Sequence, residues 1–302
     1  MPINTIAYNE KLTDALDKAA VQKAVTGIFA DNALRAKFVG AKTVLIPEVD
    51  MAALADYDRD TGFTKGPVTV SNTPFTLQMD RGRSFQIDAQ DSDESGISNL
   101  IGQVAGEFVR TKVAPEMDAY VLSKLAGLAV TAGQTVGSSS PDEIENLQEA
   151  LLKVQEANGF GEDMVAFVDT KFYADLLNSG HITRYLSVGD FKKGDMNTKV
   201  QTFNGVPIIP VASDRMKTAY TFNDGTTGGQ EEGGFVPAAE AKNIRLLVLP
   251  RNGASLVKKT EKTRTFSPDQ NLTADAWKMD YRIYYDVFVK NSKKPTIWAV
   301  VE

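Results

Sequence analysis

The chain contains no cysteine and only one histidine, His181, among its 302 residues. The lack of cysteine excludes disulfide frameworks and thiolate nucleophiles, and with a lone histidine it also excludes Cys/His zinc sites. His181 follows Gly180 in an expected loop without a G-x-S-x-G motif nearby, so we interpret it as structural or exposed rather than catalytic. Stability must come from packing, with association between chains as a further source.

Basic residues are also fewer than acidic ones. The formal net charge is −6, from 33 Lys and Arg against 39 Asp and Glu. A protein that grips nucleic-acid phosphates needs a basic face. The basic clusters at 192–193, 258–259 and 293–294 are isolated pairs, which are typical of solvated surface.

Several common site patterns are missing. No segment approaches the roughly 18 apolar residues of a membrane-spanning helix, and the first residues do not resemble a signal peptide. The glycine-rich segment 223–234 lacks a phosphate-binding motif. The acids at 88–94 lack calcium-loop spacing and are better placed to favour the start of a helix. Carboxylates are plentiful, but the sequence places no two of them together as a catalytic pair. We expect no catalytic residue, cofactor or metal.

The most informative segment that is present is 42–88. Residues 43–49 predict a strand that Pro47 places at a sheet edge, and residues 56–66 form a polar, glycine-bearing turn. Apolar residues then alternate with polar ones at Phe75, Leu77 and Met79, and the same parity resumes at Phe85 and Ile87. The pattern predicts one long two-stranded ribbon, Lys42–Asp88. Because such a ribbon is marginal alone in water, it needs another surface to lie on.

A long helix is predicted next, over 97–128. Its apolar residues step by three and four along one stripe, over about 33 residues or about 50 Å. Pro115 interrupts the stripe and is expected to kink the helix. Before the ribbon, residues 1–35 carry only a thin apolar stripe and are expected to fray or to dock on something else, such as another subunit.

After residue 140 strands and helices alternate, which predicts a compact α/β unit. Together with the ribbon, the long helix and the late strands, the expected fold class of the whole chain is α+β. Ser140 is expected to cap a helix that begins at Pro141 and ends at Asn158-Gly159, and Thr170 to cap one that runs through Leu177. Asn204-Gly205 predicts a hairpin turn between strands at 200–203 and 206–210, and 223–234 is expected to be a flexible loop. Further strands are expected at 164–168, 244–249, 256–262, 281–289 and 297–301.

The segment Asp80-Arg81-Gly82-Arg83 is the most unusual local feature. Its two arginines interrupt the apolar face of a regular strand, and a buried unpaired arginine costs several kcal/mol. They must therefore pair or reach outward. Two interpretations stay open, namely a salt bridge within the subunit and a pair with acids of a neighbouring copy.

The order of these segments resembles the tailed-bacteriophage major capsid proteins, whose fold encapsulin shells share. The residue-level resemblance lies in 56–93, from Tyr57-Asp-Arg-Asp-Thr-Gly62 through Gly66-Pro-Val-Thr-Val70 to Asp80-Arg-Gly-Arg-Ser-Phe85, which is similar to the extended loop of capsid proteins from phages of Gram-positive bacteria. The helix over 97–128 resembles the family's spine helix. The resemblance implies an N-terminal arm (1–41), an extended hairpin loop (42–95), a peripheral domain (96–140 and 255–302) and a mainly axial α/β domain (141–254).

The resemblance also implies a function and partners. The chain is expected to form pentamers and hexamers of itself that tile an icosahedral shell, assembled in the bacterial cytoplasm and found in the virion. The shell encloses double-stranded DNA without sequence-specific binding, and a scaffolding protein and a portal are further expected partners. Lys65, Asp80, Arg81 and Arg83 are the candidate inter-subunit contacts. Lys65 lies where some relatives form a Lys–Asn cross-link, although a surface lysine is the better interpretation.

Two alternatives remain. The first is an encapsulin-type nanocompartment shell, which assembles without a scaffold around an enzyme cargo. The second is a soluble α/β enzyme or sugar-binding module, which requires a deep pocket lined by convergent polar groups.

Overall fold

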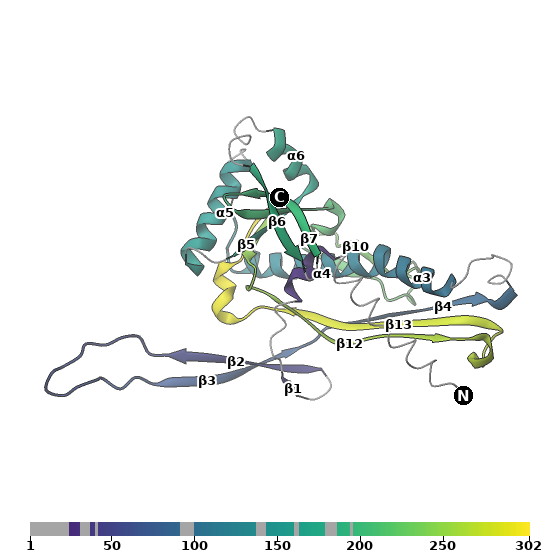
Figure 1. Ribbon diagram of the computed structural model, residues 1–302, viewed down its shortest axis with the longest axis horizontal. Helices are drawn as coiled ribbons and strands as arrows, with labels where there is room; N and C mark the ends of the chain where they lie inside the picture. The colour runs from purple at the N-terminus through teal and green to yellow at the C-terminus, as the bar shows by residue number, and fades with distance from the viewer. Residues whose placement is uncertain are drawn as a thin grey trace.

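The computed structural model describes residues 24–30, 37–39, 42–90, 100–136, 143–159, 163–178, 186–193 and 196–302. They form a body of two layers from which one long hairpin projects (Figure 1). His181, the expected cap at Ser140, most of the N-terminal arm and the acids at 91–94 lie outside the described residues.

The long helix crosses the middle of the body. It comprises α3 (Leu100–Phe108), a π-helical segment η2 (Val109–Val113) and α4 (Ala114–Thr131). Pro115 lies in the first turn of α4, and because proline has no N–H to donate, the wider π turn before it lets the helix continue. The helix thus widens directly before Pro115, and the expected kink stays a prediction.

A three-stranded antiparallel sheet lies along one side of this helix, in the order β12 (Ser255–Phe266), β13 (Ala276–Phe288), β4 (Met79–Asp88) (Figure 1). Its inner face packs on the helix through aromatic rings. Phe85 and Tyr281 both contact Phe108 edge to face, with ring centroids 4.8 and 5.6 Å apart. Helix and sheet share one hydrophobic core.

A six-stranded sheet forms the second layer, in the order β14-β11-β5-β8-β7-β6. The strands are β5 (Met164–Asp169), β6 (Leu186–Lys193), β7 (Met196–Phe203), β8 (Val206–Val211), β11 (Ile244–Pro250) and β14 (Trp298–Val301). The helices α5 (Glu143–Asn158) and α6 (Thr170–Asn178) pack against it. The predicted turn is confirmed, since Asn204 and Gly205 have φ of 50° and 81° between β7 and β8. Asp169, rather than the expected Thr170, caps α6 by accepting a hydrogen bond from the Phe172 N–H at 2.6 Å.

The hairpin is shorter than the sequence pattern predicts. β2 (Thr43–Met51) pairs with β3 (Val68–Thr76) and with the short β1 (Lys37–Val39). After Leu77 and Gln78, however, the chain leaves the hairpin and enters β4, which pairs with β13 of the body. The prediction of one ribbon from 42 to 88 is therefore wrong beyond Thr76. Alternation continues through both strands because each buries one face, and alternation alone does not name the partner strand.

Two strands thus lie in sheets other than those that the expected domain boundaries imply. β4 belongs to the three-stranded sheet rather than to the hairpin, and β14 joins the six-stranded sheet beside β11. Short elements complete the fold, namely η1 (Val25–Phe29), η4 (Ser213–Arg215), β9 (Tyr220–Phe222), β10 (Phe235–Pro237), η5 (Pro268–Gln270) and η6 (Asn291–Thr296).

Residues 24–30 of the N-terminal arm dock on the helix of their own chain. The buried Asp118 of α4 accepts hydrogen bonds from the Val25 N–H at 3.0 Å, the Thr26 N–H at 2.9 Å and the Thr26 hydroxyl at 2.8 Å. Burial raises the pKa of the Asp118 carboxyl, while these hydrogen bonds act in the opposite direction. This clamp fixes where the arm meets the body.

Candidate interaction surfaces

The root of the hairpin is built into the body. Val44, Ile46 and Leu77 are buried against Tyr284 and Phe288 of β13 and Val257 of β12. The Phe75 and Phe288 rings lie 5.1 Å apart, and the Tyr284 hydroxyl donates to the Leu77 carbonyl at 3.0 Å. The even-numbered side chains of β2 therefore face the body at this end.

Asp286 of β13 joins the root to the long helix. Its fully buried carboxylate accepts from Lys124 Nζ at 2.6 Å and the Tyr120 hydroxyl at 2.9 Å, both on α4, and from the Gln78 N–H at 3.2 Å. Burial and this carboxylate raise the pKa of Tyr120, which therefore stays protonated and donates. One carboxylate thus ties together the helix, the sheet and the start of the hairpin.

A second, more exposed contact holds the hairpin further out. Glu48 accepts from the Asn291 N–H and from Asn291 Nδ2, both at 2.9 Å, and from the Thr73 hydroxyl at 3.1 Å. These hydrogen bonds lower the pKa of the Glu48 carboxyl, with Asn291 as the largest cause. Beyond this point the hairpin runs clear of the body (Figure 1).

The projecting part of the hairpin exposes an apolar face. Val49 lies opposite Val70 and Met51 opposite Val68, so these four side chains share one side of the two strands. Their exposed fractions are 58%, 65%, 68% and 63%. Leu54, Tyr57 and Phe63 add exposed apolar surface towards the tip, whereas the other large apolar residues exposed in the described chain are scattered, at Val130, Leu152, Leu177, Val236 and Leu272.

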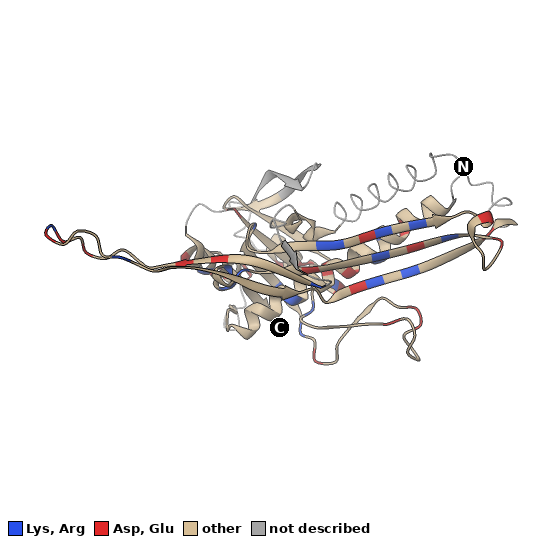
Figure 2. Ribbon diagram, turned by 90° about the horizontal axis from the view of Figure 1, so that it is seen from below, with Lys and Arg blue, Asp and Glu red and all other residues tan. Residues whose placement is uncertain are grey.

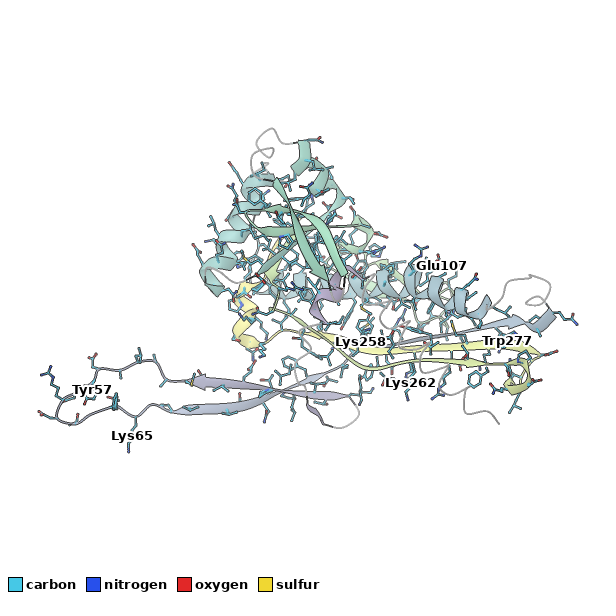
Figure 3. All side chains as sticks on the ribbon, viewed as in Figure 1. Tyr57, Lys65, Glu107, Lys258, Lys262 and Trp277 are labelled. Carbon is cyan, nitrogen blue, oxygen red and sulfur yellow. The ribbon has the colours of Figure 1, made fainter. Side chains whose placement is uncertain are left out.

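The tip itself is ordered by local contacts. Asp58 Oδ1 accepts from the Asp60 N–H at 2.7 Å, and the Tyr57 and Phe63 rings lie 4.8 Å apart. Tyr57 and Lys65 both lie at this far end of the molecule (Figure 3). Lys65 is exposed and makes no ion pair within the described residues.

The arginines of β4 have partners within their own chain. Arg81 forms a two-point ion pair with Glu116 of α4, with Nε–Oε1 at 2.7 Å and Nη2–Oε2 at 3.2 Å. On the opposite face of β4, Asp80 is bonded by Arg282 of β13. Gly82 lies between Arg81 and Arg83, and glycine is needed there because a Cβ would lie 2.8 Å from the Tyr281 carbonyl oxygen. Within the subunit, Arg81 is thus paired where it interrupts the apolar face.

Arg81 and Arg83 also organise the segment between β9 and β10. Arg81 donates to the carbonyls of Asn223 at 2.7 Å and Gly234 at 3.2 Å, and Arg83 donates to that of Glu231 at 3.1 Å. Within the same segment, Asp224 accepts hydrogen bonds from the backbone N–H groups of Thr226 and Thr227, both at 2.8 Å. The expected flexible loop is therefore hydrogen-bonded internally and to β4.

The outer face of the three-stranded sheet is charged. Figure 2 shows cations and acids in bands across its strands. Lys278 and Asp280 pair at 3.7 Å, next to the Asp80–Arg282 pair. Alternating charges of this kind are typical of a solvated surface. Lys258 and Lys262 of β12 and Trp277 of β13 mark the length of this sheet, and Glu107 lies on the helix (Figure 3).

No group of His, Asp and Glu in the described residues is arranged to hold a metal ion. No helix in the same residues is long and apolar enough to cross a membrane. Sequence reasoning missed Asp286 and Glu116, although an acid within the apolar run Tyr284-Tyr-Asp-Val-Phe288 is a visible signal of a buried partner.

The sequence matches no known family model and no curated protein, but solved structures match it. The chain is similar to the capsid of cyanophage P-SCSP1u, with a TM-score of 0.55, 14% identity, and 88% of this chain and 84% of that chain covered. It is similar to the mature capsid of bacteriophage PhiM1, with a TM-score of 0.52, 14% identity, and 86% and 82% covered. A virus-like particle from Pyrococcus furiosus gives a TM-score of 0.50, 13% identity, and 97% and 99% covered.

These likenesses span between 86% and 97% of the chain. They show the class of fold that the geometry defines, which is α+β and is found in the shells of phages and virus-like particles. The chain has the tailed-phage major capsid fold, as its sequence predicted.

Proposed function

We propose that this chain is a major capsid protein, which assembles with copies of itself as pentamers and hexamers into an icosahedral phage head around double-stranded DNA. The observation that carries the proposal is the exposed apolar face of the hairpin. Contiguous apolar surface on a projecting element is typical of an interaction site, and a ribbon of two strands needs a surface to lie on. In a shell, a neighbouring subunit supplies that surface.

The remaining assignments belong to the same proposal. The helix with the three-stranded sheet corresponds to the peripheral domain, and the six-stranded sheet with α5 and α6 to the axial domain. A scaffolding protein and a portal are the expected further partners. The subunit has a structural role rather than a catalytic one, and it encloses DNA without gripping it, in keeping with its net charge of −6.

Assembly of the purified chain tests this function directly. We expect closed particles by electron microscopy and sedimentation velocity, either from the chain alone or with a scaffolding protein. A chain that stays monomeric under all assembly conditions, with and without scaffold, contradicts the proposal.

An encapsulin-type shell is the second candidate, favoured by the likeness to a virus-like particle over 97% of this chain. It predicts particles that form without scaffold and that contain an enzyme cargo. Genes for a terminase and a portal beside the gene for this chain would decide against it.

The inter-subunit role of Lys65, Asp80, Arg81 and Arg83 stays a prediction. Arg81→Glu places a carboxylate against Glu116 at a site where the two side chains are 23% and 15% exposed. We expect the free energy of unfolding to fall by about 2 kcal/mol, between the values for surface and buried pairs. Urea unfolding of the monomer measures this loss.

Arg83→Glu is the matched comparison, because the Arg83 side chain is exposed and bonds only a carbonyl among the interactions described. A folded monomer that no longer assembles supports an inter-subunit contact for Arg83. If Arg83→Glu assembles normally, Arg83 is not an inter-subunit contact.

A further inference from the structure

The free edge of β3 is a second feature of the hairpin, separate from its apolar face. In the described chain β3 is the last strand of its sheet and is hydrogen-bonded on one side only, to β2. Residues 68–72 of this strand are exposed. An unpaired strand edge presents a row of backbone donors and acceptors to other chains.

The register identifies which backbone groups are free. The Leu77 N–H donates to the Lys42 carbonyl at 2.9 Å, and the Ala52 N–H donates to the Pro67 carbonyl at 3.2 Å. Because antiparallel strands alternate between residues that bond their partner strand and residues that point away, the odd-numbered residues of β3 bond β2. Val68, Val70 and Asn72 therefore direct their N–H and C=O groups outward. Pro74 follows in the same outward series, and it closes the edge because it has no N–H.

This edge lacks the charged residues that protect the edge strand β12. No Lys, Arg, Asp or Glu occurs from Gly66 to Met79. In contrast, β12, which is also an edge strand, carries Lys258, Lys259, Lys262 and Arg264. Charged residues, lysine above all, prevent edge-to-edge pairing. On the β2 side, Pro47 is one of the residues whose backbone points away from β3, and it has no N–H to offer. Glu48 and Asp50 add charge to the same strand.

We propose that the edge of β3 at Val68–Asn72 receives an extended strand from a second copy of this chain, which continues the hairpin sheet across the subunit boundary. The partner is a second copy because the edge adjoins the apolar face on the same hairpin, which a neighbouring subunit covers under the proposed function. Main-chain hydrogen bonds supply the pairing, and the uncharged stretch admits another backbone without a desolvation cost for charge. The inference rests on self-assembly and adds its backbone contact.

Hydrogen exchange at single-residue resolution tests it on the wild-type chain. In the free subunit the outward amides of Val68, Val70 and Asn72 exchange fast, whereas the inward amides of Thr69 and Ser71 are protected by β2. In the assembled shell all five amides are expected to be protected, with exchange of the outward ones slowed by roughly 100-fold or more. Shells in which the outward amides still exchange as fast as in the free subunit would falsify the pairing while leaving the shell function intact.

Two variants of Asn72 provide an independent test. Asn72→Pro removes one outward N–H and blocks the edge without breaking a bond to β2, and the natural Pro74 shows that the strand accepts proline in this series. Asn72→Ala removes the same side chain but keeps the N–H. We expect the proline variant to reduce the rate of assembly by roughly tenfold or more, and the alanine variant to assemble as the wild type does. Equal assembly of both variants overturns the inference, whereas failure of the wild type itself to assemble overturns the proposed function instead.

Discussion

Val49→Asp is expected to prevent shell assembly while leaving the subunit folded. Val49 is 58% exposed and lies within the apolar face opposite Val70, so the isolated subunit solvates the new carboxylate without loss. In an assembled shell the same carboxylate would be buried without a partner, at a cost of about 2 kcal/mol or more. That cost weakens each contact by about 30-fold, and it recurs at every subunit.

The matched control is Val236→Asp. Val236 is also an exposed valine on a strand, at 47%, but it lies on β10 in the body and away from the hairpin. Sedimentation velocity measures assembly, and circular dichroism and urea unfolding measure the fold of both variants. If Val49→Asp assembles as readily as Val236→Asp, the apolar face of the hairpin is not an assembly contact.

Asp286→Ala is expected to cause the largest loss of subunit stability. Its removal leaves the Lys124 ammonium, the Tyr120 hydroxyl and the Gln78 N–H without their shared acceptor at a partly buried site. Breaking one side of a buried ion pair costs about 3–5 kcal/mol, and we expect about 3 kcal/mol here because the Lys124 side chain is 31% exposed. Urea unfolding of the wild type and the variant gives the difference directly.

Asp280→Ala is the control on the same strand. Asp280 lies on the outer face of the sheet, 39% exposed, where it contacts Lys278 and Ser84. Its loss is expected to change stability by no more than about 0.5 kcal/mol. Equal losses for the two variants would mean that Asp286 does not hold the hairpin root to the helix.

Local patterns predicted most of the fold. The apolar stripe over 97–128, the alternation around Phe75 and Phe85, and the turn at Asn204-Gly205 correspond to the long helix, to β3 and β4, and to the β7–β8 hairpin. These features depend on neighbouring residues, whose spacing the sequence displays. The class of fold followed from the order of the elements.

Partner choice could not be predicted in the same way. β4 pairs with β13, which lies some two hundred positions further along the chain, and alternation is identical whichever strand is the partner. Arg81 was singled out because it interrupts an apolar face, but its partner Glu116 looked like an ordinary surface acid on a helix. Identifying such pairs requires the positions of the elements in three dimensions, and sequence periodicity does not contain that information.

The same limit explains the hairpin. Exposure of Val49, Met51, Val68 and Val70 is invisible in their sequence, because valine alternation equally predicts a face buried in the subunit. Only the projection of the hairpin beyond Glu48 shows that these side chains have no cover within the described chain. The exposure of this apolar face is thus a property of the fold rather than of the residue types.

The exposed apolar face of the hairpin also affects the solubility of the free subunit. Under the proposed function, a free subunit that exposes this apolar face is less soluble than the assembled particle, because assembly removes the face from water. Free subunits are therefore expected to accumulate only to a ceiling concentration, above which each newly made chain enters a particle or an aggregate. Which of these two fates a chain meets is decided by how quickly its hairpin meets a neighbour.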